Sequence, residues 1–91
     1  MSDDPREIQR RRLRFRSWHR GTREADLMLG RFADAHLAGF TADQLDRYAA
    51  LLEKSDPDLY DWITGRAPVP AAVDTDVFRL LKDFKFHDAT S

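Results

Sequence analysis

The fold of this chain is decided at His19-Arg20-Gly21-Thr22-Arg23-Glu24-Ala25-Asp26, where an arginine-rich N-terminal segment meets the first strongly amphipathic helix. Gly21 can adopt a positive φ angle, which suits a short turn between two helices. Glu24 and Asp26 follow where the N-terminus of a helix favours negative charge. The stretch therefore predicts an exposed turn and a helix that begins near Thr22, with Thr22 or Gly21 as its N-cap.

Helices are predicted on both sides of this turn. The first covers about residues 6–19, and we expect it to pack firmly near Phe15 and Trp18, with Leu13 well off that face. The second covers about residues 22–37. Gly30 lies inside the second helix and is unfavourable there, so it indicates either a close crossing by a neighbouring helix or a bend.

Three further helices are predicted after residue 37. Thr41 and Gln44 have the spacing of a capping box at the start of the third. The fourth is short, with Asp56 as its N-cap and Pro57 at its first position, and it ends at Gly65. Asp74 or Thr75 caps the last. The residues that recur at helical spacing, and that we expect in the core, are Leu29, Phe32, Leu45, Tyr48, Leu52, Leu59, Trp62, Leu80 and Leu81.

These patterns predict an all-α protein, a single small bundle of about five helices over residues 1–91, with loose tails at about 1–6 and 87–91. The chain has no cysteine, and its three histidines are far apart in sequence, so we expect no metal site. No apolar run is long enough to span a bilayer, and the acidic start is unlike a transit peptide. A bacterial cytoplasmic protein, without membrane insertion, fits these features.

Charge is unevenly distributed along the chain. The formal net charge is −1, yet residues 5–23 carry eight arginines against the single acidic residue Glu7. Such polarity suits steering toward an acidic surface, although an arginine-rich helix is often only a solvated face. Ser17 and His19 are two apart on a helix and face different ways, which argues against a nucleophile and base pair. No enzymatic constellation emerges from the sequence.

Three sequence motifs together resemble the SdhE family. They are Arg12-Leu13-x-Phe15-x-Ser17, Arg20-Gly21-x-x-Glu24 and Asp56-Pro57-Asp58-Leu59-Tyr60-x-Trp62. Members of this family are assembly factors that promote covalent FAD attachment to the flavoprotein subunit of succinate dehydrogenase. The resemblance covers about residues 9–81. It implies a chaperone-like role without catalysis and without a cofactor of its own, acting on FAD bound to that client or to the similar subunit of fumarate reductase.

The resemblance also implies which residues meet the flavoprotein. Arg20, Gly21 and Glu24 would face it near the flavin cleft, flanked by Arg16, His19, Arg23 and Asp26. A second arginine or lysine often stands in the family where this chain has His19, so one interface charge here depends on pH. The motif of residues 56–62 is expected to be mainly structural. Its residues are Asp56, Pro57, Asp58, Tyr60 and Trp62, with Trp62 as an anchor and Tyr60 where phenylalanine is frequent.

Two other classes of protein stay open on sequence alone. The arginines of residues 6–23 permit a small nucleic-acid-binding protein, but the rest of the chain is acidic and no recognition helix can be singled out, so no nucleic acid is expected as a partner. An antitoxin-like or generic adaptor is also compatible with the residues. We expect a monomer when the protein is free, because no long apolar heptad seam appears.

Overall fold

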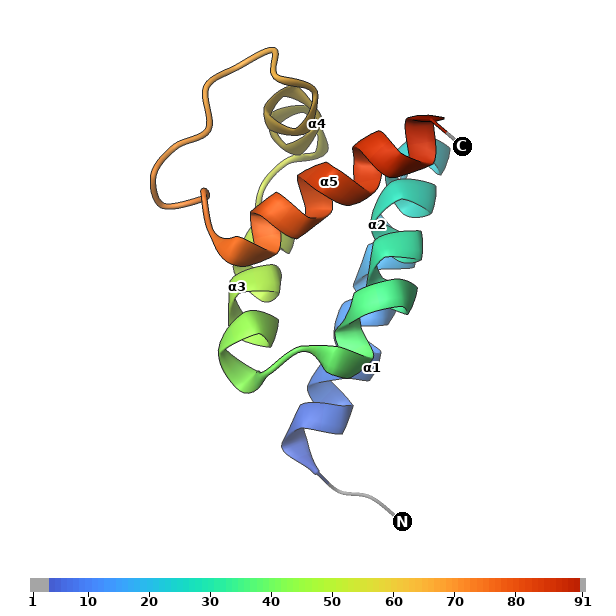
Figure 1. Cartoon of the computed structure of the whole chain (residues 1–91). Helices are drawn as coiled ribbons and strands as arrows, with labels where there is room; N and C mark the ends of the chain where they lie inside the picture. The colour runs from blue at the N-terminus through green and yellow to red at the C-terminus, as the bar shows by residue number, and fades with distance from the viewer. Residues whose placement is uncertain (1–3, 91) are drawn as a thin grey trace. The chain divides into compact units, whose positions relative to one another are not determined.

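The regular secondary structure in the computed structural model is helical (Figure 1). The structure describes the backbone of residues 4–90 and the side chains of residues 4–84. The helices are α1 (Pro5–Trp18), α2 (Arg23–His36), the short 3-10 helix η1 (Leu37–Gly39), α3 (Ala42–Leu52), α4 (Asp56–Thr64) and α5 (Asp76–Thr90). No strand occurs within residues 4–90. The predicted all-α class, with five α-helices, is confirmed for this part of the chain.

The chain divides into two compact units, residues 1–46 and 47–91. The first holds α1, α2, η1 and the start of α3, and the second holds the rest of the chain. That both belong to one domain stays a prediction. The backbone is already helical at Pro5, and α5 continues to Thr90 through the segment predicted to be loose from residue 87. The outermost residues of the predicted tails, 1–3 and 91, lie outside the described part.

In the first unit, α1 and α2 pack against each other as a helical hairpin. Gly30 is buried where they approach, and a Cβ added to it would overlap the indole ring of Trp18. Of the two explanations for a glycine inside α2, the close helix approach is therefore the one observed. Trp18 also donates from Nε1 to Oδ1 of Asp34 at 3.4 Å, and Arg14 Nε lies 3.3 Å from the same oxygen.

The buried face of α1 differs from the predicted one. Leu13 is 2% exposed and Ser17 is fully buried, whereas Phe15 is 63% exposed and Trp18 is half-buried. The prediction that Phe15 packs inward and Leu13 does not was wrong. Its cause is that polar residues share the inner face with Leu13, which an apolar pattern does not reveal. The hydroxyl of Ser17 donates to the carbonyl of Leu13 at 2.7 Å, so its burial leaves no polar atom unpaired.

Arg10 is the second polar residue on the inner face of α1. Its Nε donates to the carbonyl of Leu37 and its Nη2 to the carbonyl of Phe40, each at 2.9 Å, while Nη1 pairs with Glu7 at 2.6 Å. Carbonyls at the C-terminal end of a helix lack intrahelical donors, and a cation there is favoured by the helix dipole. The hydrogen bonds of Arg10 therefore hold α1 against the end of α2 and against η1.

The predicted starts of α2 and α3 are confirmed at the level of single hydrogen bonds. Thr22, and not Gly21, is the N-cap of α2, because its Oγ1 accepts from the backbone N–H of Ala25 at 3.2 Å. Thr41 and Gln44 form the expected capping box. The Gln44 N–H donates to Thr41 Oγ1 at 3.2 Å, and the Thr41 N–H donates to Gln44 Oε1 at 3.0 Å.

In the second unit, the N-cap of α4 lies one residue earlier in the chain than predicted. Ser55 is the N-cap of α4, since its Oγ accepts from the backbone N–H of Asp58 at 3.2 Å, and the predicted cap Asp56 is already the first helical residue. Pro57 therefore stands second in the helix, and not first as predicted. The helix ends as predicted at Gly65, whose φ of 80° is left-handed. Such a residue is a common C-cap, and glycine adopts it without steric cost.

Of the two predicted caps for α5, Thr75 is the one observed. Its Oγ1 accepts from the backbone N–H of Phe78 at 3.3 Å. Asp74 instead pairs with Arg79, with 3.0 Å between Arg79 Nε and Asp74 Oδ1. The hydrogen bond from Arg79 lowers the pKa of the Asp74 carboxyl below its ordinary value.

Most of the predicted core is buried. Trp62 and Leu80 are only half-buried, and the other seven residues of the predicted set are at most 3% exposed. The core also contains residues that the helical spacing did not single out: Leu13, Phe40, Leu51, Val73 and Phe78.

Candidate functional site

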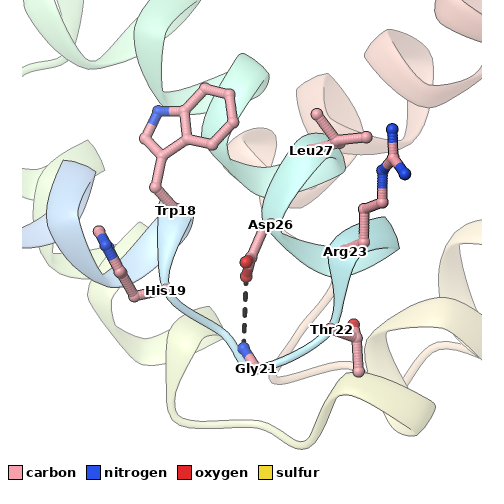
Figure 2. Close-up of a pocket in the computed structure, with 7 residues that line it drawn as sticks. All are labelled: Trp18, His19, Gly21, Thr22, Arg23, Asp26 and Leu27. Carbon is pink, nitrogen blue, oxygen red and sulfur yellow. Dashed lines mark hydrogen bonds between the residues drawn. The ribbon is translucent and has the colours of Figure 1, made fainter.

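The turn between α1 and α2, residues 19–22, is held by one carboxylate. Oδ1 of Asp26 accepts from the backbone N–H of Arg20 at 2.6 Å and from that of Gly21 at 3.3 Å. In Figure 2 this carboxylate points back from the first turn of α2 toward Gly21. Asp26, which the family resemblance placed among the partner contacts, thus uses one of its oxygens to fix the shape of the turn.

Gly21 is required by the backbone of the turn and not by crowding around it. Its φ angle is 115°, a conformation that residues with a Cβ rarely adopt. The residue is exposed, and a Cβ added to it would meet no atom within 4 Å. The surface over Gly21 is therefore open to the approach of another chain.

Charged side chains surround this glycine at the same end of the hairpin. Arg23 and Glu24 are exposed in the first turn of α2, and neither forms a hydrogen bond or ion pair through its side chain within residues 4–84. Arg16 and Arg20 are half-buried, and His19 is exposed. All the predicted partner contacts thus lie on the last turn of α1, the connecting turn or the first turn of α2.

A surface hollow of about 560 Å³ opens beside the turn. Figure 2 shows the residues that line it, which are Trp18, His19, Gly21, Thr22, Arg23, Asp26 and Leu27. The lining combines an indole and a leucine with a guanidinium and a carboxylate. Interfaces between proteins commonly combine an aromatic or apolar centre with polar groups around it. Trp18 and Leu27 were not predicted to belong to the site, because the sequence pattern assigned both only to helices.

His19 is oriented by two contacts to Phe15. Its Nδ1 lies 2.7 Å from the carbonyl oxygen of Phe15, and the two rings stack with centroids 4.0 Å apart at 17°. A carbonyl oxygen only accepts, so this hydrogen bond requires the proton on Nδ1. Nε2 is then the nitrogen of His19 that remains for a partner. Ser17 is buried and bonded to Leu13, so the two side chains do not form a nucleophile and base pair.

The motif of residues 56–62 lies wholly within the unit of residues 47–91, which does not contain the turn. Asp56 and Pro57 begin α4, and Asp58 supplies the N–H that Ser55 caps. Tyr60 is 42% exposed, with the guanidinium of Arg66 at 6.0 Å from its ring centroid. Trp62 is half-buried. The residues at 56–58 thus belong to the start of α4, and a mainly structural role for the whole motif stays a prediction.

The described residues contain no cluster of three or more histidine, aspartate or glutamate side chains that would hold a metal ion. Within the same residues, no helix has the length and apolar character needed to span a membrane.

Comparisons with known proteins point to one family. A family model described as "Flavinator of succinate dehydrogenase" matches residues 11–85. FAD assembly factor SdhE of Acetobacter pasteurianus is 40% identical over 79 residues, which cover 87% of this chain and 72% of that protein. Mitochondrial succinate dehydrogenase assembly factor 2-B of Drosophila simulans is 40% identical over 83 residues, covering 89% of this chain and 53% of the relative. The corresponding factor of Dictyostelium discoideum is 40% identical over 73 residues, 80% of this chain and 52% of the relative. The chain spans about half the length of these mitochondrial relatives.

Proposed function

The chain belongs to the family of flavinators of succinate dehydrogenase, and from this premise we propose that it is an assembly factor for that enzyme. In this proposal it binds the flavoprotein subunit and promotes the covalent attachment of FAD to it. The names of the relatives, FAD assembly factor and succinate dehydrogenase assembly factor, support both parts. The structural observation that carries it is the exposed turn at Gly21, where open space lies beside Arg23 and Glu24, whose side chains have no hydrogen-bond or ionic partner among residues 4–84.

Each part of the turn has a chemical use at a protein interface. The guanidinium groups of Arg20 and Arg23 suit carboxylates of the client, which they can bind through two parallel hydrogen bonds. Glu24 can accept hydrogen bonds from client donors. Gly21 leaves room for the client backbone, and Asp26 holds the two amides of the turn so that these groups keep one arrangement. The contact set that we propose is Arg16, His19, Arg20, Gly21, Arg23 and Glu24, with Asp26 behind them.

We propose a role in positioning and not in chemistry. Covalent attachment of FAD builds negative charge on the flavin ring, which is best stabilised by donors and cations that are already in place. In this proposal those groups and the reacting histidine belong to the flavoprotein. A factor that holds the client in the reactive geometry accelerates the step without touching the reacting atoms. The factor then needs no cofactor of its own.

The setting of this activity is part of the proposal. We place it in the bacterial cytoplasm, with the flavoprotein subunit of fumarate reductase as a second client and with a monomer as the free state. Size-exclusion chromatography of the free protein and of mixtures with each flavoprotein tests the monomer and the second client. A stable dimer of the free protein, or the absence of a complex with either subunit, contradicts them.

The direct test of the function is a flavinylation assay. Apo flavoprotein subunit and FAD are incubated with and without this protein, and covalently bound flavin is measured by in-gel fluorescence over time. We expect covalent flavin to accumulate faster when the factor is present. Equal rates with and without the factor, together with no complex on a sizing column, would exclude this function.

Association with the flavoprotein should slow as ionic strength rises. Residues 5–23 carry eight arginines, and such a cationic segment steers encounter with an acidic surface mainly through the association rate. Stopped-flow measurement at low and at physiological salt gives this dependence. Arg23→Gln should lower the low-salt rate, whereas Arg79→Gln, which changes the net charge equally but outside the segment, should leave it unchanged. A rate that does not respond to salt means that steering by this segment is unimportant.

A further inference from the structure

The outward side of α1 carries a row of exposed side chains that the proposed contact set does not use, apart from His19. Residues spaced by three, four and seven positions share one face of a helix. This face lies opposite the buried Leu13 and Ser17, and the acidic residues nearest to it are the N-cap Asp4 and Glu7, which pairs with Arg10. We call it the outer stripe, and it consists of Ile8, Arg11, Arg12, Phe15 and His19.

Phe15 is the main apolar group of the outer stripe. It is 63% exposed, and Ile8 on the same face is 37% exposed. The Phe15 ring is stacked on His19 at 4.0 Å, and His19 is in turn hydrogen-bonded to the Phe15 carbonyl. An exposed aromatic ring that is already held in place loses little conformational freedom when a partner covers it. Phe15 thus has the properties of an interface anchor.

The charges of the outer stripe are available to a partner. Arg11 and Arg12 are exposed, and neither forms a side-chain hydrogen bond or ion pair within residues 4–84. This distinguishes them from Arg10 and Arg14 of the same helix, which pair with Glu7 and Asp34. Unpaired guanidinium groups beside an aromatic ring complement a surface with carboxylates around an apolar recess.

The outer stripe is continuous with the turn. A shallow hollow of about 180 Å³ is lined by Phe15, Arg16, His19 and Arg20. His19 also lines the larger hollow over Gly21, so the two hollows adjoin at this residue. A partner seated on the turn therefore reaches Phe15 without a gap.

From these observations we propose that the outer stripe is a docking surface for the same flavoprotein, which inserts the Phe15 ring into an apolar recess and places carboxylates against Arg11 and Arg12. This inference rests on the proposed function and adds a second area of contact to it. Binding energy at interfaces is concentrated in a few desolvated aromatic and arginine residues, so we expect Phe15, Arg11 and Arg12 to supply most of the affinity of this area. A nucleic acid fits less well, because the chain outside residues 5–23 is strongly acidic.

The test measures the affinity of the apo flavoprotein for Phe15→Ala and for Phe15→Tyr, with the unmutated chain as reference. We expect Phe15→Ala to raise Kd by roughly tenfold or more and to slow flavinylation at limiting factor, which is the loss of one interface anchor. Phe15→Tyr keeps a ring that can stack on His19 but brings a hydroxyl into the apolar recess, so it should bind more tightly than Phe15→Ala and less tightly than the reference. The double variant Arg11→Gln/Arg12→Gln should weaken the salt dependence of association.

Each outcome of this test decides the inference. If the unmutated chain binds and Phe15→Ala binds equally well, the outer stripe is not a docking surface, while the proposed function stands. If the unmutated chain does not bind the flavoprotein, both proposals fail. If Phe15→Ala binds a single-stranded oligonucleotide less tightly and the flavoprotein unchanged, the stripe serves nucleic acid and the inference is overturned. Circular dichroism and chemical denaturation of Phe15→Ala confirm that the fold is kept, as its exposure predicts.

Discussion

Gly21→Arg should abolish flavinylation of the client while the helices of this protein remain folded. A Cβ added at Gly21 would meet no atom within 4 Å, so crowding around that atom does not force the chain to unfold. The substitution does, however, place a long cation over the open surface at Gly21, where we propose that the client backbone approaches. The φ angle of 115° adds a strain of about 1 to 2 kcal/mol, which the fold has to absorb.

Two matched variants separate these effects. Gly21→Ala has the same conflict between a Cβ and the positive φ angle but adds no long side chain, so it should keep most of the activity. Gly65→Arg adds the same residue at another positive φ angle, 80°, where a Cβ also meets no atom within 4 Å. It should lose stability as Gly21→Arg does and yet promote flavinylation.

The measurements are in-gel flavin fluorescence for activity and circular dichroism for the fold. Full flavinylation by a folded Gly21→Arg protein would remove the turn from the functional surface. Loss of the fold in Gly21→Arg, but not in Gly65→Arg, would make Gly21 a structural residue. Glu24→Ala then becomes the cleaner probe, because Glu24 is exposed and makes no side-chain hydrogen bond or ion pair within residues 4–84.

The second large effect is expected for Phe32→Ala, which should lower the free energy of unfolding by about 3 to 5 kcal/mol. Phe32 is fully buried, with the rings of His36 and Phe40 at 4.6 Å and 6.1 Å from its own. Removing it leaves a cavity between the end of α2 and η1. A loss of this size is a large part of the roughly 5 to 15 kcal/mol that stabilises an ordinary domain.

Phe15→Ala is the matched control for this prediction. It deletes the same atoms from an exposed site of the same unit and should change the free energy of unfolding by less than about 0.5 kcal/mol. Urea denaturation followed by circular dichroism gives both values, provided that the slope with denaturant is the same for the two variants. Equal losses would mean that Phe15 packs inward, as the apolar pattern of α1 predicted, and that the face of α1 seen here is wrong.

Local signals in the sequence were sufficient for much of the fold. The capping box of Thr41 and Gln44, the N-cap at Thr22 and the glycine stop at Gly65 each involve residues within about one helical turn, and each was found where predicted. Ser55 and Asp56 show the limit of such signals. Both are good N-caps and they are adjacent, so sequence preference alone does not choose between them.

Tertiary contacts explain what the sequence did not predict. The inner face of α1 was assigned wrongly because Arg10 finds its carbonyl partners 27 and 30 residues along the chain. Within the candidate site, the motif located the turn between α1 and α2, and the roles of the seven residues around it stay a prediction. The hollow could not be predicted, because the Trp18 side chain is placed by the packing of α1 on Gly30 of α2.

The hydrogen bonds of Asp26 bear on how loss-of-function alleles in this region should be interpreted. The donors that it holds are backbone N–H groups of Arg20 and Gly21, which every residue except proline supplies. An allele at position 20 can therefore remove a guanidinium from the proposed client contact and keep the backbone hydrogen bond to Asp26. An allele at position 26 leaves the other side chains of the proposed contact set in the sequence and yet removes the hydrogen bonds that hold the turn. The two would give the same phenotype in a genetic screen, one by losing a contact and the other by losing the geometry of contacts that are still encoded.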